Sequence, residues 1–241
     1  EIGSGLVGSE MCIRDRPKAF RFINEYFNGK RSGNSESSLP NETPFIQTAN
    51  ATVYYPEQAQ GSTRKYPIIY VQGEINEQQQ KVLVSQFHQM VDENKTWPAV
   101  LCFVKANTDL SETISDIEKQ LSGIRGSQRM RALITLGDNI KEGIEAIQGE
   151  NLFTGIVCVN AIGNENDAQN LIKAVNSYKR YPRCWIEILP ESKEYGFSSN
   201  IHILLKESDL EHEFRSRKCK EANVFTYWED WILYLNNRIH V

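Results

Sequence analysis

From residue 66 onward, short apolar runs alternate with amphipathic segments of ten or more residues. Five apolar runs are short enough to be buried strands: 66–72, 98–104, 130–136, 154–159 and 184–189. In the segments between them, apolar side chains recur every three or four residues, as they do along the buried face of a helix. Strands that alternate with helices of this length favour a mostly parallel sheet covered on both faces. The sequence therefore predicts an α/β fold.

The remaining elements extend this pattern in both directions. We expect a strand at 51–55, a more polar last strand at 212–219, and helices at 76–94, 110–124, 166–178, 198–208 and 228–237. The clearest helix is 110–124, because Leu110, Ile114, Ile117, Leu121 and Ile124 recur at spacings of three and four. Before residue 48, residues 19–27 fit a short helix, and the Ser-, Asn- and Gly-rich residues 29–43 fit a flexible connector.

These patterns divide the chain into three parts. Residues 1–16 contain VGSEMCIRDR, which resembles translated sequencing-adaptor read-through, so we expect them to be foreign to the native protein. Residues 17–47 are the N-terminal helix and connector, and residues 48–241 form one domain.

Residues 1–16 lack the apolar centre of a signal peptide, whereas sequons at Asn41, Asn50 and Asn94 are compatible with secretion. A cytoplasmic and a secreted location both stay open, as does the oligomeric state.

Composition narrows the classes of partner. The formal net charge is −4 and no basic cluster occurs, so we expect no nucleic-acid partner. Apolar runs stay short of 18 residues, so we expect no membrane span. The five cysteines are scattered without a C-x-x-C or Cys/His cluster, which favours buried structural thiols over a metal site. We expect neither a metal nor a cofactor.

The segment RMRALITLGDNIKEG, residues 129–143, is typical of a strand, a tight turn and a helix start. Asn139 is expected to cap the helix, with Glu142 three residues later as in a capping box. In α/β hydrolases, a strand-turn-helix of this kind carries the nucleophilic serine of a G-x-S-x-G motif. The corresponding residues here are Thr135 to Asn139, which include no serine.

A family resemblance follows from several segments taken in order. Residues 51–74, ATVYYPEQAQGSTRKYPIIYVQGE, resemble the opening of esterase D-type esterases, a group that includes S-formylglutathione hydrolases, feruloyl esterases and enterochelin esterase-like enzymes. Four later segments are similar to parts of the same family: 131–133, 153–155, 201–214 and FTYWEDW at 225–231. The resemblance covers roughly residues 48–239. It implies an α/β-hydrolase-like three-layer sandwich, with a mostly parallel central sheet between two layers of helices, and the activity of a carboxylic-ester hydrolase.

The residues at the family's catalytic positions differ from those that ester hydrolysis requires. The resemblance places the nucleophile on Gly137, the histidine on Asn223 and the acid on Ser192 or Glu191. Glycine has no attacking atom, and an amide cannot act as a general base near neutral pH. The family's H-G sequence after the first core strand is also changed, because Gln72, Gly73 and Glu74 stand there.

Three functions are consistent with these observations. The leading hypothesis is an inactive pseudoenzyme that binds a small molecule or a protein in the former cleft, or that serves a structural role. The alternative is an active ester hydrolase whose Ser-His-acid site is displaced or misaligned. The third is a hydrolase-fold paralogue or fragment without a selected role. The residues expected to line the cleft are Gly73, Glu74, Asp138, Glu191 and Tyr227.

Other candidate sites have structural interpretations beside the functional ones. Asp138 and Glu191 could converge on a metal or a sugar, or they could cap a helix and face solvent. The aromatic residues between 225 and 234 could form a carbohydrate platform, but core packing of a terminal helix is favoured. No histidine falls at the family's catalytic position; the four are His88, His202, His212 and His240.

Overall fold

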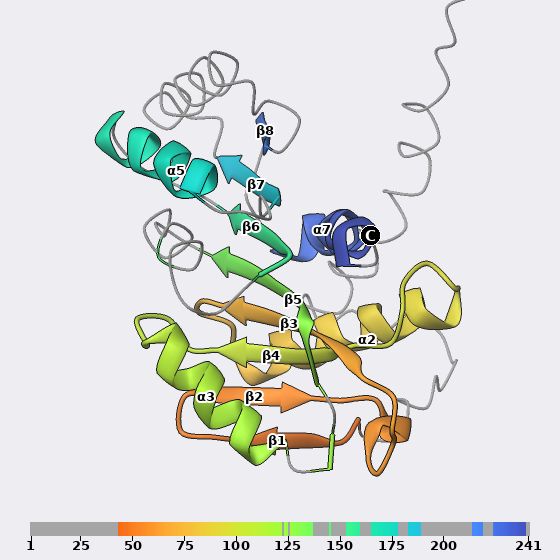
Figure 1. Cartoon of the computed structure of the whole chain (residues 1–241). Helices are drawn as coiled ribbons and strands as arrows, with labels where there is room; N and C mark the ends of the chain where they lie inside the picture. The colour runs from red at the N-terminus through yellow and green to blue at the C-terminus, as the bar shows by residue number, and fades with distance from the viewer. Residues whose placement is uncertain are drawn as a thin grey trace, which may run out of the picture. The chain divides into compact units, whose positions relative to one another are not determined.

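A computed structural model describes residues 43–121, 123–124, 126–136, 145, 153–159, 165–177, 183–188, 214–218 and 224–239. The chain divides into two compact units, residues 1–41 and 42–241, and all described residues belong to the second unit. Within them, one sheet has the strand order β1-β2-β4-β3-β5-β6-β7-β8 (Figure 1). The strands are β1 (Phe45–Gln47), β2 (Ala51–Tyr54), β3 (Tyr66–Gln72), β4 (Val100–Val104), β5 (Gly126–Leu136), β6 (Gly155–Val159), β7 (Arg183–Ile188) and β8 (Phe214–Lys218). The helices are the 3-10 helix η1 (Glu57–Ala59), α2 (Glu77–Asp92), α3 (Leu110–Gln120), α5 (Glu165–Ser177) and α7 (Val224–Ile239).

The sheet is mostly parallel. Strands β3 to β8 pair in parallel, and β2 runs antiparallel to both β1 and β4. Strand β5 lies in the middle of the order, between β3 and β6. Every residue of β3, β4 and β6 is buried, which is why these strands read as continuous apolar runs rather than as alternating ones.

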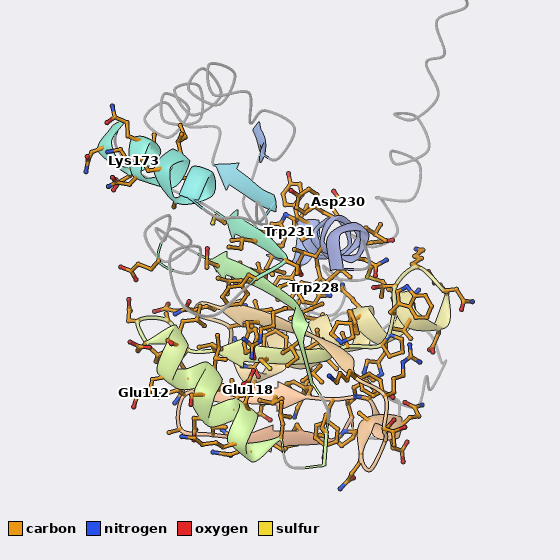
Figure 2. The ribbon with its side chains drawn as sticks, viewed as in Figure 1. Glu112, Glu118, Lys173, Trp228, Asp230 and Trp231 are labelled. Atoms are coloured by element: carbon orange, nitrogen blue, oxygen red, sulfur yellow. The ribbon has the colours of Figure 1, made fainter. Side chains whose placement is uncertain are left out.

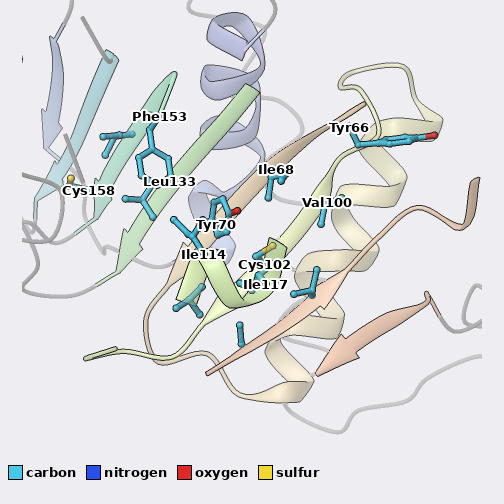
Figure 3. Close-up of a cluster of buried hydrophobic side chains, with 14 of the residues drawn as sticks. Tyr66, Ile68, Tyr70, Val100, Cys102, Ile114, Ile117, Leu133, Phe153 and Cys158 are labelled. Atoms are coloured by element: carbon cyan, nitrogen blue, oxygen red, sulfur yellow. The ribbon is translucent and has the colours of Figure 1, made fainter. Parts of the chain in front are cut away.

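Two hydrophobic clusters cover the two faces of the sheet. On one face, β3, β4, β5 and β6 pack against Ile114 and Ile117 of α3 (Figure 3). Leu171 of α5 belongs to the same cluster. On the other face, the same strands pack against Leu83 and Phe87 of α2 and against the aromatic residues of α7. The predicted α/β fold, with a mostly parallel sheet between two layers of helices, is confirmed.

Local capping determines where α2 and α3 begin. Asn76 accepts a hydrogen bond from Gln79 N at 2.9 Å, and Gln79 Oε1 accepts one from Asn76 N at 3.0 Å, which completes a capping box. Asp109 accepts a hydrogen bond from Glu112 N at 2.8 Å at the start of α3.

Several element boundaries differ from the predicted ones. Helix α3 ends at Gln120 rather than at 124, and Gly123 follows with φ of 88°, a left-handed conformation that stops a helix. Leu121 and Ile124 are nevertheless buried, which explains why the apolar spacing continues past the helix. Strand β5 starts four residues before the predicted residue 130, and α7 extends beyond the predicted 228–237 at both ends.

Strand β1 was not predicted, and it lies within the segment 17–47 assigned to the N-terminal helix and connector. Three residues are too few to display the alternation that identifies a strand. The expected helices at 19–27 and 198–208 lie outside the described residues, as does all but residue 145 of the helix expected after Asn139.

Candidate functional site

The carboxyl ends of β3 and β5 lie side by side at the edge of the sheet where α/β proteins usually bind ligands. Gln72 of β3 is in register with Thr135 of β5, so Gly73 and Leu136 are the next residues along the two strands. A Cβ atom placed on Gly73 would lie 2.7 Å from Leu136 Cβ. Gly73 also has φ of 156°, which disfavours a side chain. A glycine at this position leaves room for the Leu136 side chain against the backbone at the end of β3.

The hydrogen bonds of the loop after β3 limit which of its groups can meet a ligand. Gly73 N–H donates to Val104 O at 3.0 Å, and the Asn76 N–H is used in the capping box. The backbone N–H groups of Glu74 and Ile75 are the remaining donors of this loop. Among the cleft candidates, Glu74 is exposed beside Gly73 at this edge.

The other residues at the predicted triad positions and at the turn lie outside the described part of the chain: Gly137, Asp138, Glu191, Ser192 and Asn223. The chain nevertheless connects two of them to described elements. Gly137 follows the last residue of β5, and Asn223 precedes the first residue of α7. The loss of the triad stays a prediction.

Three buried oxygen atoms lie on β3 and β5 just before this edge. Tyr70 Oη, Gln72 Oε1 and Thr135 Oγ1 are all buried and have no hydrogen-bond partner among the described residues. Gln72 Nε2 donates to Thr108 O at 3.1 Å, which fixes the orientation of that amide. Burial is the main cause that raises the pKa of the Tyr70 hydroxyl, so this group stays protonated. An unpaired buried polar group lowers the free energy of unfolding by about 1–3 kcal/mol. Each of these three atoms therefore destabilises the fold unless a group beyond the described residues bonds to it.

His88 is the only histidine among the described residues, and it lies far from this edge. It is twelve residues beyond the N-cap Asn76 of α2, which at 1.5 Å per residue is about 18 Å along the helix axis. Burial lowers its pKa, and Asp92 partly offsets this effect. His88 therefore cannot act as a base at the carboxyl edge of β5.

The aromatic residues of α7 pack in the core. Trp228 and Trp231 are buried against the sheet (Figure 2). Tyr234 is buried in the same cluster. The core-packing interpretation is confirmed, and these three rings do not form a carbohydrate platform. Tyr227 is half-buried and stacks on Trp231, with ring centroids 5.9 Å apart. Its expected place at the cleft stays a prediction.

The described ranges contain neither a metal-binding cluster nor a membrane-spanning helix. No group of three His, Cys, Asp or Glu side chains there could hold a metal ion. No helix there is long and apolar enough to span a membrane. The described cysteine side chains, Cys102 and Cys158, are buried thiols, and burial raises the pKa of Cys102. For these two residues, the interpretation as buried thiols is confirmed.

The sequence did not predict a cavity of about 230 Å³ at the corner formed by β1, β2, β4 and the start of α2. Gly73 also lines it, so it begins beside the carboxyl edge of β3. The available signal was the pair of aromatic residues Phe45 and Tyr54, which lie opposite each other in a hairpin. That signal was missed because β1 itself was not recognised.

Solved structures of esterases share the arrangement of strands and helices described above. No protein-family model matches the sequence, and no curated protein matches it. A solved ferulic acid esterase matches with a TM-score of 0.60 and 12% identity, over 82% of this chain and 97% of the esterase. A mutant of the feruloyl esterase module from Clostridium thermocellum, complexed with sinapinate, matches with a TM-score of 0.60 and 13% identity, over 87% and 95%. S-formylglutathione hydrolase from Staphylococcus aureus matches with a TM-score of 0.54 and 12% identity, over 82% and 97%. The chain therefore has the α/β-hydrolase-like fold of these solved structures.

Proposed function

We propose that this chain, whose fold is that of the esterase D-like α/β hydrolases, no longer cleaves esters and instead binds a small molecule or a protein at the carboxyl edge of its sheet. One observation carries the proposal. The central strand β5 ends at Leu136, so the next residue in the chain is Gly137. Enzymes with this fold carry their nucleophile on the turn that follows such a strand.

The chemistry of the substituted positions supports a large loss of rate. Gly137 offers no atom that could form an acyl-enzyme, and the amide of Asn223 cannot take a proton from a nucleophile. Removing either the nucleophile or the base of a serine hydrolase lowers kcat by about 10⁶. The remaining rate, roughly 10³–10⁴ over water, comes from binding and oxyanion donors.

The contact between Gly73 and Leu136 supports a retained binding role. Because Gly73 has no side chain, Leu136 at the end of β5 packs directly against the start of the loop after β3. The N–H groups of Glu74 and Ile75 would then be available to an oxygen atom of a ligand, since Gly73 N–H already bonds to Val104 O. In active enzymes of this fold, the equivalent loop supplies one oxyanion donor.

Activity-based labelling tests the proposal directly. We expect no labelling of the full chain by a fluorophosphonate probe, and no hydrolysis of p-nitrophenyl acetate above that of heat-unfolded protein. Stoichiometric labelling of any serine would overturn the proposal and support the alternative, an active hydrolase with a displaced site.

A gain-of-reactivity variant tests the assignment of the two positions. In the double variant Gly137→Ser with Asn223→His, we expect the probe to label residue 137 faster than in Gly137→Ser alone. Equal rates would mean that residues 137 and 223 do not face each other. Gly137→Ser alone is the matched control because it carries the same hydroxyl without the base.

A further inference from the structure

We propose that strand β1 is the docking edge for a second copy of this chain, and that the two β1 strands pair antiparallel about Ile46 to form a twofold dimer. Strand β1 is the last strand on its side of the described sheet (Figure 1). Twofold dimers are the commonest assemblies of soluble proteins. The inference does not rest on the proposed function, because the pairing involves neither the loop after β3 nor the chain that follows β5.

The hydrogen bonds of the β1–β2 hairpin leave the backbone groups of Phe45 and Gln47 directed away from β2. Thr48 N–H donates to Ala51 O at 2.8 Å, so these two residues form a hydrogen-bonded pair. Opposite residues in an antiparallel ladder alternate between hydrogen-bonded and non-hydrogen-bonded pairs. Ile46 therefore bonds to β2, whereas Phe45 and Gln47 do not. Two N–H and two C=O groups lie along the outer side of β1.

The hairpin carries none of the side chains that usually protect an edge strand. Native proteins block such edges with charged side chains or with a proline on the open side. Residues 43–56 contain no charged side chain, so two hairpins can meet without repulsion between like charges. Pro44 is no obstacle, because its carbonyl faces β2 and accepts a hydrogen bond from Tyr55 N–H at 3.2 Å.

The outward groups of two copies are complementary in one register. When Ile46 lies opposite Ile46 of the second copy, Phe45 of each strand lies opposite Gln47 of the other. Each of these two pairs exchanges two hydrogen bonds, because both residues direct their N–H and C=O groups outward. Every outward group of both strands is then used. A shift of two residues would carry one of the two residues past the end of the other strand.

The same register covers an exposed aromatic ring. Phe45 is 50% exposed, although large apolar side chains are usually buried. Its ring centroid lies 5.7 Å from that of Tyr54, which fixes the face of the sheet on which it stands. In the proposed dimer the two Phe45 side chains occupy diagonal positions on one face, roughly 7–8 Å apart, a distance that aromatic side chains can span. An unrelated strand would meet the backbone groups but not the ring, which favours a second copy.

The length of β1 limits the strength of the dimer. Three residues from each copy form a small interface, and interfaces below about 1,200 Å² are typical of weak, transient complexes. We expect Kd to be roughly 0.1–1 mM. Sedimentation equilibrium of the full chain from about 10 µM to about 1 mM covers this range. The mass should rise from that of the monomer, 27.6 kDa, toward twice that value.

Two substitutions of Gln47 separate backbone pairing from side-chain contact. Gln47→Pro removes the outward N–H of residue 47 in each copy, and with it two of the four hydrogen bonds between the strands. Kd should therefore rise by about 10- to 100-fold. Gln47→Ala is the matched control, because it shortens the same side chain and keeps the N–H. Its Kd should stay within about 3-fold of that of the unsubstituted chain.

Cysteine cross-linking tests the register. In the proposed dimer, residue 46 lies opposite itself in a non-hydrogen-bonded pair, with Cα atoms about 4.5 Å apart, a separation that a disulfide can bridge. Ile46→Cys should therefore form a covalent dimer under a mild thiol oxidant. Gln47→Cys is the control, because the two copies of residue 47 lie on a diagonal and should cross-link more slowly. The unsubstituted chain gives the background from its native cysteines.

Three results would overturn the inference. The first is a monomer mass at every concentration up to about 1 mM. The second is an equal Kd for the Gln47→Pro and Gln47→Ala proteins when both unfold at the same temperature. The third is cross-linking of the Ile46→Cys protein no faster than that of Gln47→Cys. These readouts are mass and cross-linking rather than reaction with an esterase probe, so their failure is distinct from failure of the proposed function.

Discussion

Gly73→Ala tests the close approach between β3 and β5 at the candidate site. The added methyl group would lie 2.7 Å from Leu136 Cβ and 3.2 Å from Leu136 Cγ. Contacts this short force either the backbone of β3 or that of β5 to move. The substitution also places a side chain at φ of 156°, where L residues are strained.

The expected loss of stability follows from these two effects. Backbone strain costs about 1–3 kcal/mol. Overpacking in a tight site costs about 1–3 kcal/mol more. Together they give a loss of about 2–6 kcal/mol, and even about 3 kcal/mol would lower Tm by roughly 6–12 °C in a domain of this size.

Urea unfolding of the full chain measures the free energy of unfolding, with Gly61→Ala as the matched control. Gly61 has φ of 72° and no atom within 4 Å of a built Cβ, so its substitution should cost only about 1–2 kcal/mol of strain. A double-mutant cycle with Leu136→Gly should show that the two sites interact by at least about 1 kcal/mol. The reasoning is refuted if Gly73→Ala costs no more than Gly61→Ala, since the contact with Leu136 would then be absent.

Three further substitutions test the packing, the capping and the charges of the described elements. Trp231→Ala should lower the free energy of unfolding by about 3–5 kcal/mol in chemical denaturation, because the Trp231 ring is fully buried. Trp97→Ala should cost about 1 kcal/mol or less, because Trp97 is half exposed. Equal losses would contradict the assigned burial. Asp109→Ala should cost about 1 kcal/mol in the same assay, because Glu112 N loses its acceptor at the start of α3; an unchanged midpoint would contradict the cap. His88 has a lowered pKa in the folded state, so the unfolded chain binds more protons and stability falls as pH drops below about 6.5. His88→Gln should reduce the difference in unfolding free energy between about pH 5.5 and about pH 7.5, and an identical difference in both proteins would contradict this linkage.

The sequence predicted correctly those elements whose residue pattern follows directly from burial or from local hydrogen bonds. The run 66–72 forms β3 without an error at either end, because each of its residues is buried and none is needed for a turn. Asn76 and Gln79 likewise mark the start of α2 through local hydrogen bonds between neighbours. Such features depend on nearby residues, so they can be read from the chain alone.

Features that depend on distant residues were harder to predict. The end of α3 was placed too late because Leu121 and Ile124 continue the apolar spacing while contacting the core from outside the helix. In the sequence, Gly73 was identified by a changed family motif and as an expected cleft residue, but not by the contact it makes. That contact, with Leu136, joins two strands that the sequence keeps far apart.

The pairing of β3 with β5 has a consequence for how the protein is made. Ile68 pairs with Arg131, 63 positions later, whereas Phe45 pairs with Tyr54 only nine positions away. Contacts between distant residues form slowly, so the middle of the sheet closes late while the β1–β2 hairpin can form early. A nascent chain that has not yet emerged beyond residue 126 exposes one whole side of β3, a seven-residue apolar strand. Such an open strand is a template for self-association, so shortened chains that stop before β5 will aggregate rather than fold.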